Sequence, residues 1–520
     1  MLLNGVELEV SNIRDLVIAR ASLGQKPLLK CREEVLTYAE AHVRSNRVAN
    51  ALAALGLGKG DVLATYMYNS VDHAVLWFAC AKLGAVWAPL NVSLNQDDLA
   101  YSLADSGARV VVVDTDLMET YQLARPEVAS GLIEIVWRSP DSPDVDATGF
   151  REFTDLLTGA DLTPDVHISP DDPLAIVYTG GSTSMPKGVL VSHLYYLGGA
   201  LRYRDVTGAQ PDDVHFANSH FFHIGGQQFG VTGPLFVGMT GVMTKWFSVS
   251  NYWKIVCQSG ATIIDPLGTM MSALLTRPRD EDVEHRVRLG VGIASGQVRP
   301  ELRDEFEERF GIPLLEVYSM TEMGVLLFSE RPDDRRRGSS GRSHGWAEVM
   351  IADELDMPVP IGETGHILVR PNVPHTFMKE YVNKPVETVA SWRNLWYHTG
   401  DLGRVDEDGY VYFVGRQAHW IRRRGENVSA FEVEKAIAAH PHVRDVAAVG
   451  VPSELGEEDI KVYVQLVDGA DPDPLGVVDW CRERIAYFKV PRYVEFVDDF
   501  PRTITKAEIA RHELKELGIG

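Results

Sequence analysis

The sequence predicts an α/β protein with a large N-terminal domain of doubly wound parallel sheets, a small β-barrel-like region, and a small, mobile α+β C-terminal domain. In the first third of the chain, helical patterns alternate with short apolar runs, which indicates a parallel sheet covered on both faces. After Arg331 the pattern changes to short strands and polar turns. With 520 residues, the chain is too long for one hydrophobic core and requires at least two domains.

The N-terminal elements follow from the spacing of apolar residues. Helical spacing covers residues 36–57 and 71–83, and strand-like runs cover 62–66 and 109–113. The glycine-rich run 56–61 predicts a helix end followed by a turn. These segments therefore predict successive strand–helix units of one sheet.

A second alternating block follows in the middle of the chain. Its strand candidates lie at residues 174–177, 263, 291–293 and 314–318. The polar loop 335–342 ends this block, and the hairpin signal 406–409 precedes the strand-like residues 410–413. We therefore expect a small antiparallel region after the second block.

Composition and charge restrict the class of protein. An apolar content of 45% indicates a folded globular protein, and a net charge of −23 disfavours nucleic acid or an anionic membrane as a partner. No signal peptide opens the chain and no apolar run reaches membrane-spanning length, so we expect a soluble, cytoplasmic protein. Four widely spaced cysteines without CxxC or Cys/His spacing predict buried, reduced thiols. They are Cys31, Cys80, Cys257 and Cys481.

Residues 178–188 form a loop rich in glycine and hydroxyl groups after the predicted strand 174–177. Glycine lets backbone N–H groups approach phosphate oxygens, hydroxyls add donors, and lysine adds a point charge. The candidate phosphate ligands are Thr179, Gly180, Gly181, Ser182, Thr183, Ser184 and Lys187. The loop is not a Walker A loop, because Pro186 precedes the lysine and Gly188 follows it. The structural alternative is a flexible surface turn.

Three further motifs follow this loop in order. They are residues 316–322, residues 397–401, and Gly415-Arg416 with residues 422–427. Together the four motifs resemble the signature of the adenylate-forming superfamily, which contains acyl-CoA synthetases, nonribosomal adenylation domains and luciferases. Residues 424–429 are most similar to acyl-CoA ligases of the carnitine/crotonobetaine type. The resemblance runs from about Leu36 to Leu514.

The resemblance implies an ATP-dependent, AMP-forming acid–thiol ligase. In such an enzyme a carboxylate and ATP give acyl-AMP and pyrophosphate, the small domain rotates, and the CoA thiolate displaces AMP. The family places its hinge after Arg416, which predicts domains 1–415 and 416–520. Ala418 then stands at the pivot, and Gly425 and Glu426 line the CoA channel.

The resemblance also assigns the ATP site. The loop from Thr179 to Lys187 holds the β- and γ-phosphates, Thr321 contacts the α-phosphate, and Glu322 binds the Mg²⁺ that bridges phosphate oxygens. Tyr318 offers a ring face to adenine, and Asp401 and Arg416 bind the ribose hydroxyls. The strip along the other side of the base is Gly296, Gln297 and Val298. The structural alternatives are a solvated Glu322, a core Tyr318, a turn residue at Asp401 and a surface charge at Arg416.

Residues 221–226 match the segment that closes the acyl site in the family, and they contain Phe222, His223 and Gly225. His223 is predicted to gate the site or to orient the carboxylate, and its alternative is a structural histidine. His220 and His223 lack the further ligands of a zinc site. Relatives that activate amino acids carry an aspartate beside this aromatic residue, and this chain has none. The substrate is therefore expected to be a non-amino carboxylic acid.

Four positions depart from the family pattern, and one of them is Ala418, because relatives usually carry an acidic residue or a lysine at the pivot. Ser184 and Ser319 replace glycines, and Ser319 is expected to shorten or polarise the acyl pocket. The catalytic lysine near the C-terminus is displaced: counted from Pro501 it is Lys506, and counted back from Leu514 its place is taken by Glu508.

A structural role would explain why a glutamate stands at position 508. Thr505 and Glu508 have the spacing of a capping box, which predicts a helix that starts at Lys506. The buried face of this helix would be Ala510, Leu514 and Leu517. Without a lysine near the reacting groups, adenylation slows while thioester formation survives.

The leading hypothesis is an acyl-CoA synthetase that uses Mg²⁺, ATP and CoA. The alternatives are an acyl-adenylating enzyme that delivers to a carrier protein and an enzyme that performs only one half-reaction. A binding protein without turnover is a third hypothesis, against which Lys187, Glu322 and Asp401 argue. A homodimer is the default expectation for assembly.

Overall fold

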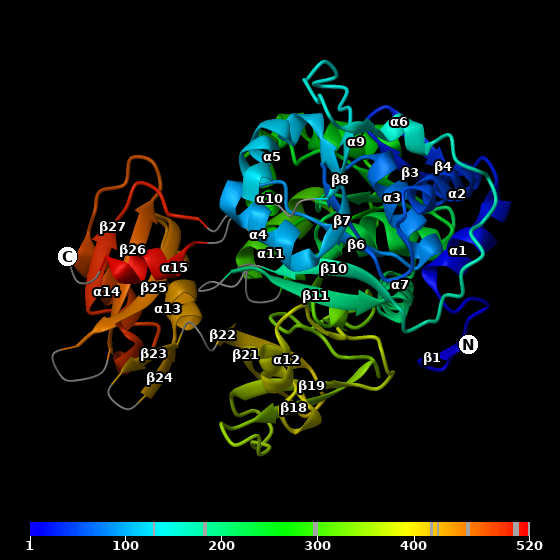
Figure 1. The fold of residues 1–520 in the computed structure, drawn as a ribbon. Coiled ribbons are helices and arrows are strands. Elements are labelled where there is room, and N and C mark those ends of the chain that lie inside the picture. The colour runs from blue at the N-terminus through cyan, green and yellow to red at the C-terminus, as the bar shows by residue number, and fades with distance from the viewer. Residues whose placement is uncertain are drawn as a thin grey trace. The chain divides into compact units, whose positions relative to one another are not determined.

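The computed structural model describes residues 1–127, 131–179, 185–294, 300–416, 420–423, 426–453, 458–502 and 509–517 (Figure 1). The chain packs into two compact units. The first contains Met1–Thr179, Pro186–Glu348 and Pro371–Ala390, and the second contains Val349–Arg370 and Ser391–Gly520. The predicted domain boundary after residue 415 stays a prediction.

The first sheet of the first unit has eight strands in the order β20-β11-β10-β6-β5-β7-β8-β9. Its parallel members are β5 (Val62–Tyr66), β6 (Val86–Pro89), β7 (Ala108–Asp114), β8 (Ile133–Trp137), β9 (Arg151–Glu152) and β10 (Pro173–Thr179). Two antiparallel strands, β11 (Lys187–Ser192) and β20 (Glu380–Tyr381), extend the sheet beyond β10. The helices in the corresponding stretch of the sequence are α2 (Tyr38–Ala54), α3 (Val71–Leu83), α4 (Gln96–Ser106), α5 (Met118–Ala124) and α6 (Phe153–Leu156).

The second sheet also has eight strands, in the order β17-β16-β15-β14-β12-β13-β3-β4. Its strands are β3 (Pro27–Cys31), β4 (Glu34–Thr37), β12 (Val214–Ala217), β13 (Thr240–Met243), β14 (Ile263–Ile264), β15 (Leu289–Ala294), β16 (Leu314–Met320) and β17 (Gly324–Ser329). Only the outermost pairs, β3 with β4 and β16 with β17, are antiparallel. Its helices are α7 (His193–Thr207), the π-helix Gly226–Thr232, α8 (Gly233–Val237), α9 (Tyr252–Ser259), α10 (Gly268–Leu275) and α11 (Pro300–Phe310).

The remaining elements of the first unit are short. They are β1 (Leu2–Leu3), β2 (Val6–Glu7), α1 (Ile13–Arg20) and α12 (Pro385–Ser391). None of the helices in the described ranges is long and apolar enough to cross a membrane.

The second unit contains three small sheets. A four-stranded sheet has the order β18 (Ala347–Ala352), β19 (Gly365–Pro371), β21 (Tyr397–Val405) and β22 (Val411–Arg416). The strands β23 (Trp420–Arg423) and β24 (Glu426–Ser429) form a hairpin. A third sheet is built from β25 (Val443–Pro452), β26 (Glu458–Leu466) and β27 (Tyr493–Phe496), with the helices α13 (Ala430–Ala438), α14 (Pro474–Arg482) and α15 (Arg511–Glu516).

Local sequence signals explain where several helices begin and end. Helix α3 begins after Ser70, whose side chain accepts a hydrogen bond from the His73 amide, and ends at Gly84 in the left-handed conformation. These two residues delimit the predicted helix 71–83, which is confirmed residue for residue. The predicted helix 36–57 is too long at both ends: Leu36 lies in β4, and α2 ends at Ala54. Helix α2 begins at a capping box in which Thr37 and Glu40 satisfy each other's backbone N–H groups.

The predicted C-terminal helix is wrong in its start. Ile509 forms an isolated β-bridge with Arg502, and the Ala510 amide donates to the carbonyl of Pro501 at 2.8 Å, so α15 begins only at Arg511. Ala510 and Leu514 are buried as predicted, but Leu517 is 63% exposed. The backbone pairing of Ile509 and Ala510 with Arg502 and Pro501 excludes both residues from the helix that the capping-box spacing predicts. Thr505, Lys506 and Glu508 lie outside the described residues.

The prediction of four buried thiols is also wrong in one position. Cys31, Cys80 and Cys481 are buried, whereas Cys257 is exposed on α9. The buried face of that helix consists of Tyr252, Trp253 and Val256, which leaves the following residue on the outer side.

Candidate active site

Glu322 is the second residue after β16, at the carboxyl edge of the second sheet. Its side chain is 7% exposed, and its Oε1 accepts a hydrogen bond of 2.8 Å from the hydroxyl of Tyr381. Oε2 accepts none from the described residues. Open α/β sheets bind ligands at this edge, so the buried carboxylate stands where a ligand is expected. The alternative of a solvated Glu322 is therefore wrong.

Tyr381 connects Glu322 to Lys187. The strand β20 pairs with β11, and the Nζ atom of Lys187 lies 5.1 Å from the centre of the Tyr381 ring. One aromatic side chain thus contacts both a predicted metal ligand and a predicted phosphate ligand. The sequence analysis missed Tyr381, because a single tyrosine on a two-residue strand has no spacing pattern that singles it out.

The predicted phosphate-binding loop connects the two strands of a β-hairpin. Thr179 ends β10 and Lys187 begins β11, and the two residues are partners in the antiparallel register. The next helix, α7, begins only at His193. A Walker A loop leads directly from a strand into a helix, so this connection differs from it, as the sequence predicts. Residues Gly180, Gly181, Ser182, Thr183 and Ser184 lie outside the described residues.

Tyr318 is packed inside the first unit. It is 6% exposed, and its ring stacks on Phe328 of the neighbouring strand β17 at 5.2 Å. Ser319 stands at a register shift of β16, where its exposed side chain accepts a hydrogen bond of 3.0 Å from the Leu326 amide. Contact of these two residues with adenine and with the acyl group stays a prediction. Gly296, Gln297 and Val298 lie outside the described residues.

The predicted acyl-site segment is an aromatic stack at the start of the π-helix. The Phe222 ring stacks on His220, with ring centres 5.0 Å apart, and contacts the tilted ring of His223 at 4.4 Å. A Cβ at Gly226 would approach the carbonyl oxygen of His220 to 2.2 Å, so the helix can begin here only with glycine. π-helices occur frequently at functional sites.

Burial lowers the pKa of His220, whose Nδ1 finds no partner in the described part of the chain. No metal-binding group of three or more His, Cys, Asp or Glu side chains occurs among the described residues.

A buried carboxylate holds the turn that leads into this segment. Asp265 follows β14 and accepts hydrogen bonds from the Asn218 amide at 2.7 Å, the Asn218 side chain at 3.2 Å and the Ser219 hydroxyl at 3.3 Å. Burial raises the pKa of Asp265 to about 7. The sequence analysis missed this residue, although its position directly after a predicted strand is a usable signal.

The predicted ribose ligands lie together in the second unit. Asp401 of β21 and Arg416 of β22 are register partners, and Arg416 Nε lies 3.6 Å from Asp401 Oδ1. Asp401 is 5% exposed and lies within a strand, so the alternative of a turn residue is wrong. Ala418, Gly425 and Lys506 lie outside the described residues, and Glu426 begins β24.

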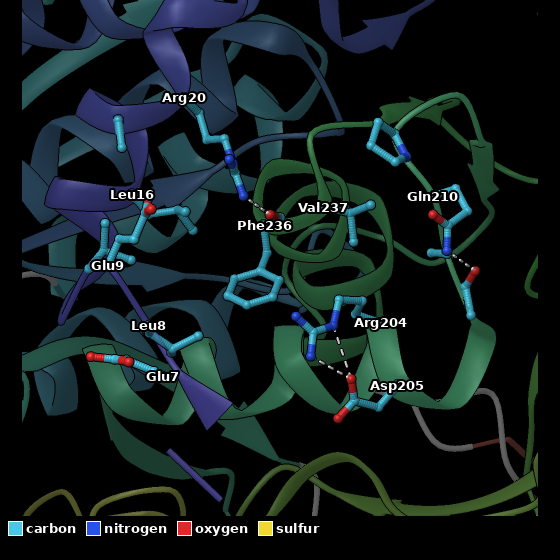
Figure 2. Close-up of a pocket in the computed structure, with 15 residues that line it drawn as sticks. Glu7, Leu8, Glu9, Leu16, Arg20, Arg204, Asp205, Gln210, Phe236 and Val237 are labelled. Atoms are coloured by element: carbon cyan, nitrogen blue, oxygen red, sulfur yellow. Dashed lines mark hydrogen bonds and ion pairs between the residues drawn. The ribbon is translucent and has the colours of Figure 1, made fainter. Parts of the chain in front are cut away.

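A cavity of about 590 Å³ lies elsewhere in the first unit (Figure 2). Figure 2 shows Arg20 directed at the carbonyl of Phe236, and Arg204 paired with Asp205. Gln210 and Val237, which also line it, stand shortly before β12 and β13. The cavity is therefore at the amino edge of the second sheet, opposite to the edge that carries Glu322.

Comparisons with known proteins identify the family of the chain. A family model described as "AMP-binding enzyme" matches residues 19–382, and one described as "AMP-binding enzyme C-terminal domain" matches residues 432–506. The crotonobetaine/carnitine–CoA ligase of Proteus mirabilis is 34% identical over 482 residues, which cover 92% of each chain.

Two solved structures extend the comparison. An anthranilate CoA ligase in complex with anthranoyl-AMP has a TM-score of 0.90 and 26% identity, with 99% of each chain covered. The O-succinylbenzoate coenzyme A synthetase of Bacillus subtilis, in complex with ATP and a magnesium ion, has a TM-score of 0.83 and 25% identity, with 96% of this chain and 99% of that chain covered. The chain belongs to the AMP-binding enzyme family, within the adenylate-forming superfamily, and is an ATP-dependent, AMP-forming acyl-CoA ligase.

Proposed function

We propose that this ligase activates a non-amino carboxylic acid, with Lys187 and a Mg²⁺ ion on Glu322 as the two cationic groups that receive the triphosphate. The observation that carries the proposal is the contact of Tyr381 with both residues, through a hydrogen bond to Glu322 and through its ring face to Lys187. The contact brings together a cation and a carboxylate that are distant in the sequence.

Electrostatics explain why the reaction needs such an arrangement. A carboxylate must attack the α-phosphate of a polyanion, and pyrophosphate must leave, so fixed positive charge provides much of the catalysis. The chain as a whole has a net charge of −23 and repels both substrates. Local cations at the carboxyl edge therefore have to overcome the repulsion.

Glu322 suits magnesium. Mg²⁺ prefers hard oxygen ligands and is usually held by one or two carboxylates together with substrate phosphates. Tyr381 occupies Oε1, and Oε2 accepts no hydrogen bond from the described residues. When bound, the ion would neutralise charge on the phosphate oxygens. Lys187 and the hydroxyl groups of Thr179 and Thr321 would bind and orient the nucleotide.

The acyl site supports a substrate without an α-amino group. Residues 219–226 contain no aspartate or glutamate. The nearby Asp265 is buried, and its oxygens already accept hydrogen bonds from Asn218 and Ser219. No carboxylate of this segment is thus available for an ammonium group. The relatives named above act on carnitine or crotonobetaine, anthranilate and O-succinylbenzoate, which places carnitine-like and aromatic acids first among the substrates to test.

The second unit completes the proposal. Asp401 and Arg416 bind the ribose, Ala418 is the hinge, Gly425 and Glu426 line the CoA channel, and Lys506 replaces the displaced catalytic lysine. These roles rest on the family resemblance and on the paired geometry of Asp401 and Arg416. A carrier protein as acceptor, a homodimer and a cytoplasmic location stay predictions.

The first test measures the two half-reactions separately. We expect ATP/pyrophosphate exchange and hydroxylamine trapping of an acyl-adenylate with non-amino acids, no exchange with α-amino acids, and thioester formation when CoA is added. Exchange with amino acids would contradict the substrate class. Thioester formed from supplied acyl-AMP, without exchange, would show that Lys506 does not replace the missing lysine. Trapping without transfer to CoA would favour a carrier protein.

A second test removes one hydroxyl group. Tyr381→Phe leaves Glu322 Oε1 without its donor, and loss of such an outer contact of a metal ligand weakens metal affinity by about 10- to 100-fold. We expect the Mg²⁺ concentration for half-maximal pyrophosphate release to rise by this factor.

The matched control is Tyr121→Phe. Tyr121 donates a hydrogen bond of the same length, 2.8 Å, to Glu134 on a different part of the first sheet. Its loss should leave the Mg²⁺ dependence unchanged. Equal Mg²⁺ dependence of both variants would contradict the role of Tyr381.

A further inference from the structure

We propose that Tyr195 and Arg202, two side chains of α7, are positioning residues that hold the segment 321–323 and thereby aim the Glu322 carboxylate. This inference rests on the proposed function in one respect, namely that Glu322 is the metal ligand. Neither residue lies in one of the sequence motifs. Both side chains donate hydrogen bonds to backbone carbonyl groups, which every residue type has.

Three consecutive carbonyl groups of this segment are bound. The Tyr195 hydroxyl donates to the carbonyl of Thr321 at 2.6 Å, and Arg202 Nη2 donates to the carbonyl of Met323 at 3.1 Å. Between them, the Met378 amide donates to the carbonyl of Glu322 at 2.7 Å. The backbone on both sides of the carboxylate is therefore fixed by groups from two other parts of the fold.

Helix geometry explains how α7 supplies two of these donors. Tyr195 and Arg202 are seven positions apart, which is close to two helical turns, so both side chains leave the same face. Burial raises the pKa of Tyr195 well above its ordinary value, so its hydroxyl stays protonated. It can then serve as a hydrogen-bond donor to Thr321 throughout the physiological pH range.

Arg202 is a buried cation with neutral partners. It is 1% exposed, its guanidinium lies 5.4 Å from the Trp346 ring centre, and no carboxylate of the described residues forms an ion pair with it. Its Nε and Nη1 atoms find no partner in the described part of the chain. Burial lowers the pKa of Arg202 to about 10, which keeps it charged at neutral pH.

A buried charge without a counter-ion destabilises a fold, and an apolar side chain would fill this space without that penalty. The residue opposite the guanidinium nevertheless leaves room for it. Gly324 has φ +83°, and a Cβ there would approach Arg202 Nη2 to 2.4 Å. The glycine thus serves both the turn after Glu322 and the close approach of the guanidinium, which ties Arg202 to the geometry of this turn.

The contacts of Tyr195 and Arg202 with residues 321–323, which we call the clamp, also relate the position of Glu322 to that of Lys187. Strand β11 begins with Lys187 and ends at Ser192, whose side chain caps α7 by accepting a hydrogen bond from the Tyr195 amide. One uninterrupted strand–helix segment therefore carries Lys187, Tyr195 and Arg202. The phosphate-binding lysine and the metal-binding glutamate are held in register by the same segment.

The test measures metal binding without turnover. Mn²⁺ affinity is determined by electron paramagnetic resonance in the presence of a non-hydrolysable ATP analogue, for Tyr195→Phe, Arg202→Met and Arg202→Lys. We expect about 10-fold weaker Mn²⁺ binding for Tyr195→Phe and Arg202→Met. Arg202→Lys, which keeps one charged donor, should recover part of the loss. The acid KM should stay near the wild-type value while kcat falls.

Arg204→Met is the matched control, because Arg204 lies on the same helix but pairs with Asp205 beside the cavity of Figure 2. Its Mn²⁺ affinity should equal that of the wild type. Tyr195→Phe removes a single oxygen atom and keeps the packing of the ring. This variant therefore tests the proposed positioning role even if Arg202→Met does not fold.

Two further outcomes separate this inference from the proposed function. Wild-type Mn²⁺ affinity in Tyr195→Phe, together with a loss in Glu322→Gln, would overturn the clamp and leave the metal assignment standing. Wild-type affinity in Glu322→Gln would overturn the metal assignment itself. A lower melting temperature of Tyr195→Phe with unchanged Mn²⁺ affinity would also overturn the clamp, because it would reduce the contact to a structural one.

Discussion

Glu322→Ala is expected to nearly abolish acid-dependent pyrophosphate release, with a loss of about 10²- to 10³-fold, because one group that stabilises charge in a transition state contributes about this much. The substitution removes the carboxylate that we assign to Mg²⁺ and leaves the Tyr381 hydroxyl without its acceptor. The rate is measured as pyrophosphate formed from ATP at saturating acid, over Mg²⁺ concentrations that extend beyond about 100 times the wild-type half-saturating value, because the metal affinity is expected to weaken.

Glu322→Gln tests charge separately from shape. The amide oxygen can still accept the hydrogen bond from Tyr381, but the side chain is neutral and binds Mg²⁺ poorly. We expect it to lose most of the activity as well. Glu134→Gln is the matched control, since Glu134 accepts the same kind of hydrogen bond from Tyr121 and has no assigned role in the reaction. Exchange at the normal rate in Glu322→Ala would show that the metal assignment is wrong.

The residues found from the sequence and those that were missed differ in how they act. Lys187 and Glu322 are proposed to act on ligands through their own charge, and their motifs follow one another in the order of the family. Tyr195 and Arg202 act through backbone carbonyls, and a carbonyl has no residue type that a sequence could reveal. Tyr381 depends on the pairing of β20 with β11, which is a property of the folded sheet.

The same distinction applies to the fold. The helix 71–83 is predictable because its cap residues are local, and the strands 62–66 and 109–113 are predictable because both faces are buried. The start of α15 is not predictable from local signals, because the pairing of Arg502 with Ile509 decides it. The π-helix after Gly225 depends on close packing against the carbonyl of His220, which no periodicity indicates.

The second prediction with a large expected effect concerns Arg303, which forms an ion pair with β16, the strand that precedes Glu322. Arg303 of α11 is 5% exposed and forms ion pairs of 3.0 Å with Glu316 of β16 and with Glu330. It also donates to the carbonyl of Leu314 at 2.7 Å. The two carboxylates are themselves buried, and Glu330 accepts a further hydrogen bond from the Glu316 amide at 2.9 Å. One cation therefore neutralises two interior carboxylates at the base of the strand that leads to Glu322.

Arg303→Met is expected to lower the free energy of unfolding of the first unit by about 3–5 kcal/mol, because removal of one partner leaves buried charges without compensation. The change is measured as the shift in urea-induced unfolding followed by tryptophan fluorescence. The control is Arg337→Met, which breaks an exposed ion pair with Asp304 of α11 and leaves the partners of Arg303 unchanged. That loss should stay below about 1 kcal/mol.

The pH dependence of this loss has a definite sign. Burial raises the pKa of both Glu316 and Glu330 above the ordinary value of 4.5, although Arg303 opposes the rise. The folded protein then binds more protons than the unfolded chain between 4.5 and the raised values, so stability decreases as the pH rises through this window. Without Arg303 the two values rise further and the window widens upward. Arg303→Met should therefore be closest to the wild type near pH 5 and furthest from it near pH 8.

A compensating variant distinguishes charge from packing as the cause. Replacing both carboxylates in the same chain, as Arg303→Met with Glu316→Gln and Glu330→Gln, removes the unpaired charges and should recover part of the stability lost by Arg303→Met alone. It should also remove the difference between pH 5 and pH 8. If the triple variant is as unstable as Arg303→Met at every pH, the arginine contributes through packing of its side chain between α11 and β16, and the electrostatic explanation of this network is wrong.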